Sequence, residues 1–175
     1  MELFDAIKRR HSYRGAFKPD PVPEADLLAI AEAGVRAPSG CNKQTTHVCI
    51  VNDPEKLKAL ATLLPRPVVQ TAQAVFVIVS DNRPAFDDTS FEEQDYSAAV
   101  ENMLLAVTAL HYASVWLDGA LRRDGIAGAI AELIGLKDLE HFTVSVILPV
   151  GVPEERCSQH DRLPLEERVT FNQMG

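Results

Sequence analysis

Cysteine is scarce in this chain, which has three among its 175 residues: Cys41, Cys49 and Cys157. An odd count without a CxxC spacing argues against both a disulfide framework and a structural zinc site. None of the five histidines has a second histidine three or four residues away, so the helical spacing that favours a metal site is also missing. We therefore expect no metal ion in the functional site.

Long apolar runs and an excess of basic charge are missing as well. No run approaches the roughly 18 residues of a membrane span, and the N-terminus turns basic at residues 8–10 before a secretory apolar core can form. The 17 basic and 25 acidic residues give a net charge of −8, which disfavours binding to the phosphates of nucleic acid. We expect a cytoplasmic protein that binds neither a membrane nor nucleic acid.

The sequence also lacks the signatures of the common nucleotide-binding folds. Neither GxGxxG after a strand nor GxxxxGK[ST] occurs, which excludes the usual dinucleotide and P-loop sites. No acid–base dyad and no activated nucleophile is evident. The chain does have 46% hydrophobic residues, enough for a core of its own, so we expect residues 1–175 to form a single domain.

Hydrophobic spacing predicts helices that alternate with strands. Proline and glycine mark most of the boundaries between them. The run 74–79 is apolar on both faces and predicts a central, buried strand in a sheet of at least four strands. The predicted helices are 2–11, 23–36, 55–64, 94–112 and 122–135, the predicted strands are 47–51, 74–79, 114–117 and 143–151, and residues 81–91 are expected to form a loop.

Two arginines flank a serine where the first helix gives way to a loop, in Arg10-His11-Ser12-Tyr13-Arg14. A guanidinium binds phosphate oxygens through two parallel hydrogen bonds, and a serine hydroxyl adds a neutral donor. The segment therefore suits a phosphate monoester. The alternative is a solvated basic helix end, where cations interact favourably with the helix dipole.

A second polar segment, Pro38–Gln44 (PSGCNKQ), joins a helix to a strand. Its asparagine and glutamine amides can pair with both the donors and the acceptors of a heterocycle edge. The alternative is an ordinary loop that ends a helix.

Two further segments follow predicted strands. Leu117-Asp118-Gly119 ends the strand 114–117, where a glycine allows a ligand to approach the backbone closely; the alternative is a plain turn. Gly151 ends the last strand, and Arg162 in the polar tail would add a third guanidinium to the phosphate site or lie free on the surface.

Together and in this order, these segments resemble the nitroreductase family of FMN-dependent oxidoreductases. Residues 10–14 fit the family's RxSxR/K element, and residues 38–44 match its PSxxNxQ loop. A long apolar helix carrying Asn102 follows, and residues 160–167 (HDRLPLEE) match the closing K/R-x-R-L-P-L-E-E element except at His160. The resemblance covers essentially the whole chain and indicates a short member, in which the lid before the long helix is reduced.

The resemblance implies an α+β fold, a three-layer sandwich with a central, mostly antiparallel sheet flanked by helices. It also implies a homodimer with two FMN sites at the interface. The implied cofactor-binding residues are Arg10, Ser12, Arg14 and Arg162, with His11 and His160, at the phosphate and ribityl chain; Pro38, Ser39, Gly40 and Asn42 at the flavin of the partner subunit; and Leu117, Asp118, Gly119 and Gly151 near the reactive edge of the ring.

The activity implied by the resemblance is ping-pong hydride transfer. NADH or NADPH reduces FMN at N5, and a small electron acceptor such as a nitroaromatic or a quinone then oxidises it. The cofactor carries this chemistry, so no side chain is expected to be catalytic. Two alternatives stay open: a non-catalytic protein that binds FMN or senses redox state, and a flavin-independent interaction domain.

Overall fold

A four-stranded antiparallel sheet runs through the middle of the computed structural model, which describes residues 1–173. The strand order is β1-β2-β4-β3, so the second strand is one of the two central strands. The strands are β1 (Thr46–Val51), β2 (Ala74–Asp81), β3 (Ala113–Ser114) and β4 (Phe142–Gly151). The helices are α1 (Leu3–Arg9), α2 (Glu24–Val35), α3 (Pro54–Leu63), α4 (Pro67–Gln70), α5 (Glu92–Ala109) and α6 (Ile126–Leu133), with short 3₁₀ turns η1 (Gly40–Asn42) and η2 (Leu165–Glu167).

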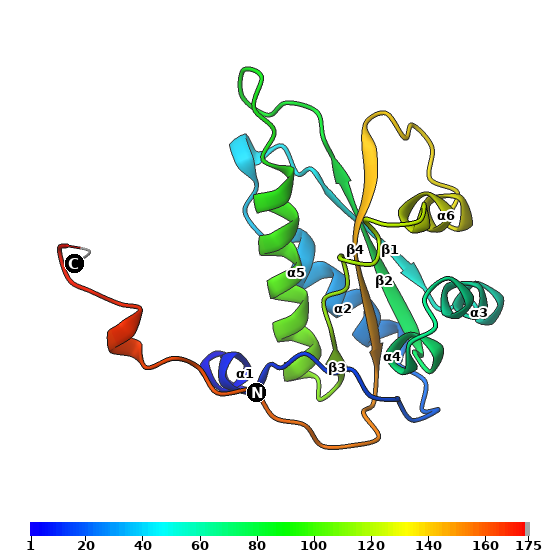
Figure 1. The fold of residues 1–175 in the computed structure, drawn as a ribbon, viewed down its shortest axis with the longest axis horizontal. Helices are drawn as coiled ribbons and strands as arrows, with labels where there is room; N and C mark the ends of the chain where they lie inside the picture. The colour runs from blue at the N-terminus through cyan, green and yellow to red at the C-terminus, as the bar shows by residue number, and fades with distance from the viewer. Residues whose placement is uncertain (174–175) are drawn as a thin grey trace.

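Helices cover both faces of the sheet (Figure 1), with α2 and α5 on one face and α3, α4 and α6 on the other. Successive side chains of a strand point to opposite faces. Phe76 and Ile78 of β2 accordingly pack with α2 and α5, whereas Val75 and Val77 pack with the helices of the opposite face. Every residue of β2 is buried. The predicted α+β three-layer sandwich and its buried central strand are thus confirmed.

Several predicted boundaries are wrong, each for a local reason. The predicted strand 114–117 shrinks to β3, after which only Leu117 pairs with the sheet, at Ile147. The predicted helix 122–135 begins at Ile126, because the residues before it form turns that end at Gly125, whose φ is +68°. The first helix ends at Arg9 because Arg10 turns away from helical geometry, with ψ of 125°. The short helix α4 was not predicted.

The extended segment after α1 is fixed against the sheet. The Tyr13 N–H donates to the Ser114 carbonyl at 2.9 Å, and the Lys18 N–H donates to Val152 at 2.8 Å. Tyr13 and Phe17 are buried in the core. Phe17 lies directly over Gly151, where an added Cβ would come within 2.7 Å of its ring. Glycine at position 151 therefore allows this close packing, which sets the position of residues 10–14.

The two helices on one face are joined by specific polar contacts. The Asn102 amide donates to the Ala33 carbonyl at 3.1 Å, so this polar group in the apolar helix has a partner. The Tyr112 hydroxyl donates to Asp26 at 2.6 Å. Burial, and then the bond to this carboxylate, raises the pKa of Tyr112 to about 12, so the phenol remains a donor at neutral pH.

Beyond Gln159 the chain leaves the body as an extended arm, residues 160–173 (red in Figure 1). The Gln159 amide donates to the Arg10 carbonyl at 2.8 Å and fixes the base of the arm. Both the arm and α1 expose large apolar side chains: Leu163, Leu165, Val169 and Phe171 on the arm, and Leu3, Phe4 and Ile7 on α1. Within residues 1–173, no helix is both long and apolar enough to cross a membrane.

Candidate active site

One cavity brings together two of the predicted site segments. Its volume is about 410 Å³, and Arg14 lies in it beside the predicted residues Leu117, Asp118 and Gly119. The contact between Tyr13 and β3 places these distant parts of the sequence side by side. We call it the arginine cavity; its lining is Arg14, Arg66, Trp116, Leu117, Asp118, Gly119, Ala120, Arg123, Asp124 and Ile126.

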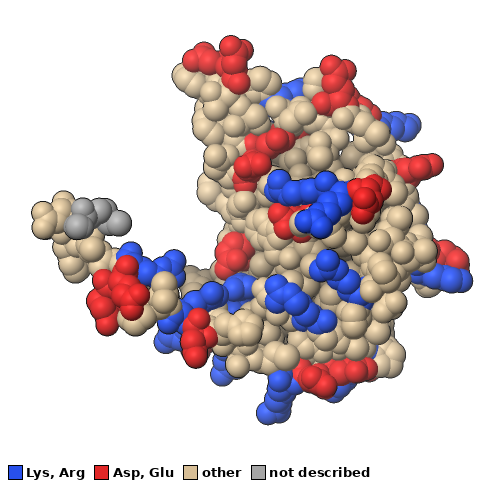
Figure 2. All heavy atoms as spheres, in the orientation of Figure 1, with Lys and Arg blue, Asp and Glu red and all other residues tan. Residues whose placement is uncertain are grey.

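The guanidinium groups of this cavity are available to a ligand. No carboxylate within residues 1–173 forms an ion pair with Arg14, Arg66 or Arg123, and Arg14 donates only to the Ser12 carbonyl, at 3.3 Å. Figure 2 shows Lys and Arg side chains gathered over the middle of one face, although the protein has a net charge of −8. Unpaired guanidiniums in a cavity of this size suit an anionic or carbonyl-rich ligand.

The backbone of the cavity also offers unused donors. Neither the Asp118 N–H nor the Gly119 N–H donates a hydrogen bond to any group of the described chain, and the position that a Cβ would take at Gly119 is open space. The Asp118 carbonyl accepts from the Leu121 N–H at 2.9 Å, which fixes the turn. The predicted close approach of a ligand to this backbone is therefore sterically possible.

Arg10 and its neighbours lie outside this cavity. The Arg10 Nε is 3.5 Å from Glu101 Oε1, and 16% of the Arg10 side chain is exposed. Ser12 forms an isolated parallel β-bridge with Ser114. The buried hydroxyl of Ser114 has no hydrogen-bond partner in residues 1–173. The Nε2 of His11 is also buried without a partner, in a different cavity that Thr108 and Cys157 help to line. His11 and Arg14 therefore line different cavities.

A buried carboxylate holds the predicted loop at residues 38–42. Asp95 accepts from the Gly40 N–H at 2.8 Å and from the Thr45 hydroxyl at 2.5 Å. Asp95 could not be singled out from the sequence, where it is one of several acids at the start of the long helix. Gly40 cannot take a side chain, since a Cβ would lie 2.4 Å from the Phe91 ring. Both Cys41 and Asn42 have positive φ, 49° and 54°, a strained arrangement of the kind found in ligand-binding loops.

This loop does not face the arginine cavity of its own chain. Pro38 and Ser39 line another cavity of about 310 Å³, together with Asp95 and Thr46, and the two cavities share no residue. Asn42 is exposed. Within one chain, the predicted loop residues and the predicted arginines are therefore separate.

The sequence profile of the nitroreductase family matches residues 7–66 and 61–152, which is most of the chain. This chain belongs to the nitroreductase family. A Thermus thermophilus protein named NADH dehydrogenase is 39% identical, the match covering 95% of this chain and 93% of that one. An Archaeoglobus fulgidus protein bearing the name NADH dehydrogenase/NAD(P)H nitroreductase is 31% identical, and the match covers 88% of this chain and 87% of that one.

Solved structures share the fold as well as the sequence pattern. A protein described as a nitroreductase from Desulfovibrio desulfuricans, solved in complex with FMN, superimposes with a TM-score of 0.81 at 26% identity. The match covers 100% of this chain and 99% of that chain. The family and the fold inferred from the four sequence segments are both confirmed.

The remaining predicted residues of this nitroreductase lie on or near the arm. His160 and Arg162 are exposed and form no hydrogen bond or ion pair with the rest of residues 1–173. Gln159, however, is bonded to Arg10. Arg162 is three residues further on, at most about 11 Å of extended chain, so the arm can bring its guanidinium toward Arg10.

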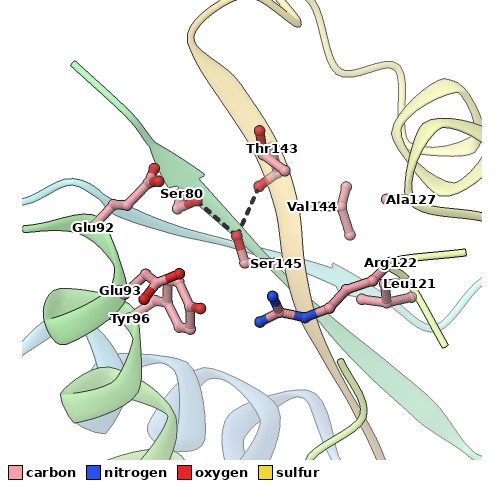
Figure 3. Close-up of a pocket in the computed structure, with 10 residues that line it drawn as sticks. All are labelled: Ser80, Glu92, Glu93, Tyr96, Leu121, Arg122, Ala127, Thr143, Val144 and Ser145. Carbon is pink, nitrogen blue, oxygen red and sulfur yellow. Dashed lines mark hydrogen bonds between the residues drawn. The ribbon is translucent and has the colours of Figure 1, made fainter. Parts of the chain in front are cut away.

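A separate polar pocket of about 210 Å³ is also present in the nitroreductase (Figure 3). Ser80 and Ser145 share a hydrogen bond of 2.7 Å there, and Arg122 points into it alongside Glu93 and Tyr96. Burial, and then the charge of Glu93, raises the pKa of Tyr96. Tyr96 packs against Trp116 of the arginine cavity, with ring centroids 6.3 Å apart.

Proposed function

We propose that this nitroreductase is an FMN-dependent NAD(P)H oxidoreductase whose flavin ring binds in the arginine cavity. The observation that carries the proposal is the meeting of Arg14 with the free backbone donors of Asp118 and Gly119 in one cavity. The family membership, the named NAD(P)H activity of the Archaeoglobus relative and the FMN in the Desulfovibrio structure support it.

The donor set of the cavity fits FMN. The flavin ring carries carbonyl oxygens and ring nitrogens that accept hydrogen bonds, and bound FMN supplies the hydride chemistry itself. Arg14, which the family resemblance assigned to the phosphate and ribityl chain, lines the same cavity as Gly119, so we assign it to the ring instead. With Arg66 it would donate to these acceptors and favour negative charge on the ring, as preorganised donors do. The Asp118 and Gly119 N–H groups would fix the orientation of the ring, and Trp116 would exclude water from one side of the cavity.

The phosphate of FMN belongs at the other end of this site in our proposal. Arg10 and Ser12 supply a guanidinium and a hydroxyl, and the bond from Gln159 to Arg10 holds the base of the arm beside them. Arg162, which follows on the arm, would add the third phosphate donor. His160 would contribute from the same segment.

The visible spectrum of the purified protein tests the cofactor. We expect a yellow protein that releases FMN on heating, identified by mass spectrometry, and whose colour NADH or NADPH bleaches in a stopped-flow experiment. A quinone added afterwards should restore the colour. Release of FAD alone, or a colourless protein that ignores added FMN, would contradict the proposal, whereas a yellow protein that is not bleached would favour the non-catalytic alternative.

We further propose that the working unit is a homodimer that builds each flavin site from two chains. The arginine cavity and the Pro38–Asn42 loop are separate within one chain, so a partner's loop is needed to complete the site. The exposed apolar side chains of α1 and the arm provide a surface for that partner. Their burial would favour association by about 25 cal/mol for each Å².

Mixing two inactive variants tests this shared site. One variant carries Arg10→Ala and Arg14→Ala, and the other carries Ser39→Ala and Asn42→Ala. After exchange, the mixed dimers have one intact site and one doubly damaged site, because the dimer is symmetric. When equal amounts of the two variants exchange at random, about half of the dimers are mixed, and each mixed dimer has one intact site. About a quarter of all sites are then intact, so activity should rise above that of both parents. If mass spectrometry shows exchange and activity does not rise, each chain has its own complete site.

A further inference from the structure

Arg123 has no part in the flavin site proposed above. The flavin ring is served by Arg14, Arg66 and two backbone N–H groups, and the FMN phosphate by Arg10, Ser12 and Arg162. Arg123 nevertheless lines the arginine cavity, is exposed to solvent, and has no carboxylate partner within residues 1–173. An exposed guanidinium that lines a cavity and has no carboxylate partner in the described residues is available to a second ligand.

The backbone around Arg123 is held in place. The Arg123 N–H donates to the Ala120 carbonyl at 3.3 Å, and the Arg123 carbonyl accepts from the Ile126 N–H at 3.1 Å. The turn directs these two adjacent arginines into different pockets. Arg123 lines the arginine cavity, whereas Arg122 points into the polar pocket (Figure 3). Arg122 is also the one that pairs with Asp118, at 3.4 Å.

The charge balance of the cavity favours an anion at this position. Three unpaired arginines line it, against Asp118, which Arg122 partly neutralises, and Asp124. A second molecule would have to reach the bound flavin in the same cavity to exchange electrons with it. An anionic substituent of such a molecule would find Arg123 among the residues that line the cavity.

We propose that Arg123 selects electron acceptors that carry a carboxylate, by binding this group in the arginine cavity. The inference rests on the proposed function, because the acceptor must reach the bound flavin. Guanidinium and carboxylate match in a bidentate geometry. The same guanidinium chemistry would also fit the pyrophosphate of NAD(P)H, so the two half-reactions have to be measured separately.

The test compares 4-nitrobenzoate with the neutral 4-nitrobenzyl alcohol on FMN-loaded protein. In Arg123→Ala, kcat/KM for 4-nitrobenzoate should fall about tenfold, the size of one lost charge-assisted bond, while the value for the alcohol stays within about twofold. Titration calorimetry on the oxidised protein should show the same tenfold loss in Kd for 4-nitrobenzoate. Arg123→Lys keeps the charge but loses the bidentate geometry. Its kcat/KM for 4-nitrobenzoate should lie between those of the wild type and Arg123→Ala.

Arg122→Ala is the matched control, because it removes the same charge from the adjacent residue and should leave the ratio of the two acceptors unchanged. An unchanged ratio in Arg123→Ala overturns the inference. So does a loss confined to the bleaching of FMN by NAD(P)H, which would assign Arg123 to the nucleotide. An FMN-loaded protein that reduces both acceptors but does not distinguish them refutes this inference alone, whereas a protein that binds no FMN refutes the proposed function and this inference with it.

Discussion

Replacing Arg10 and Arg14 together by alanine should weaken FMN binding about 100-fold. Each charge-assisted hydrogen bond contributes on the order of 1.5–3 kcal/mol, and 1.4 kcal/mol is a factor of ten in affinity. Each single substitution should therefore cost at least about tenfold. The two effects should be nearly additive, because Arg10 lies against Glu101 and Arg14 lies in the arginine cavity, so the two would bind opposite ends of FMN.

Titration of FMN fluorescence against the apoprotein measures this effect. Lys43→Ala is the control, since Lys43 is exposed and belongs to neither end of the proposed flavin site. Stability should change little in the Arg10 variant because half of the Glu101 side chain, 52%, is already exposed to water. Equal affinities for Lys43→Ala and the double variant would mean that the phosphate and the ring bind elsewhere.

Replacing Asp95 by alanine should lower the free energy of unfolding by about 3 kcal/mol or more. The carboxylate is 4% exposed and accepts two hydrogen bonds, from the Gly40 N–H and the Thr45 hydroxyl. Its removal leaves both donors without a partner inside the protein, at about 1–3 kcal/mol each. Because these bonds fix the loop at residues 38–42, FMN affinity should fall as well, by an indirect effect on position.

Urea unfolding followed by circular dichroism gives the stability change, and FMN titration gives the affinity. Glu93→Ala provides the control, as it removes an exposed acid from the same turn of α5 and should cost no more than the roughly 0.3–1 kcal/mol of a helix-dipole interaction. Asp95→Asn keeps an acceptor oxygen and should lie between the wild type and Asp95→Ala. A stability loss in Asp95→Ala no larger than in Glu93→Ala would show that the loop has other anchors.

Features that depend on local chemistry could be predicted from the sequence. The apolar run 74–79 has no polar face, which favours a strand buried on both sides, and β2 is such a strand. The helices α2, α3 and α5 could be predicted because their apolar residues recur with the helical period, between prolines and polar loops. The RxSxR and PSxxNxQ elements have fixed residue types at fixed spacing, and this is why the amino-acid sequence is enough to recognise the family.

Short elements were predicted poorly because the tertiary structure controls them. β3 has two residues, because the chain loses its pairing with β4 after Ser114 and regains it only at Leu117. The four residues of α4 have too few side chains to form a period, and only Pro67 at the helix start indicates them. Arg10 ends α1 early, because the next residues must extend to reach Ser114.

The sequence by itself determined the class of the longer segments, the family and the positions of the arginines. Only the tertiary structure decided which of them meet. Arg14 and Gly119 share a cavity because Tyr13 bonds to β3, and Arg66 and Arg123 join them from the start of α4 and the turn before α6. The loop at residues 38–42 lies elsewhere because Asp95 binds it. Such contacts depend on strand order and side-chain direction, which no local pattern of residues contains.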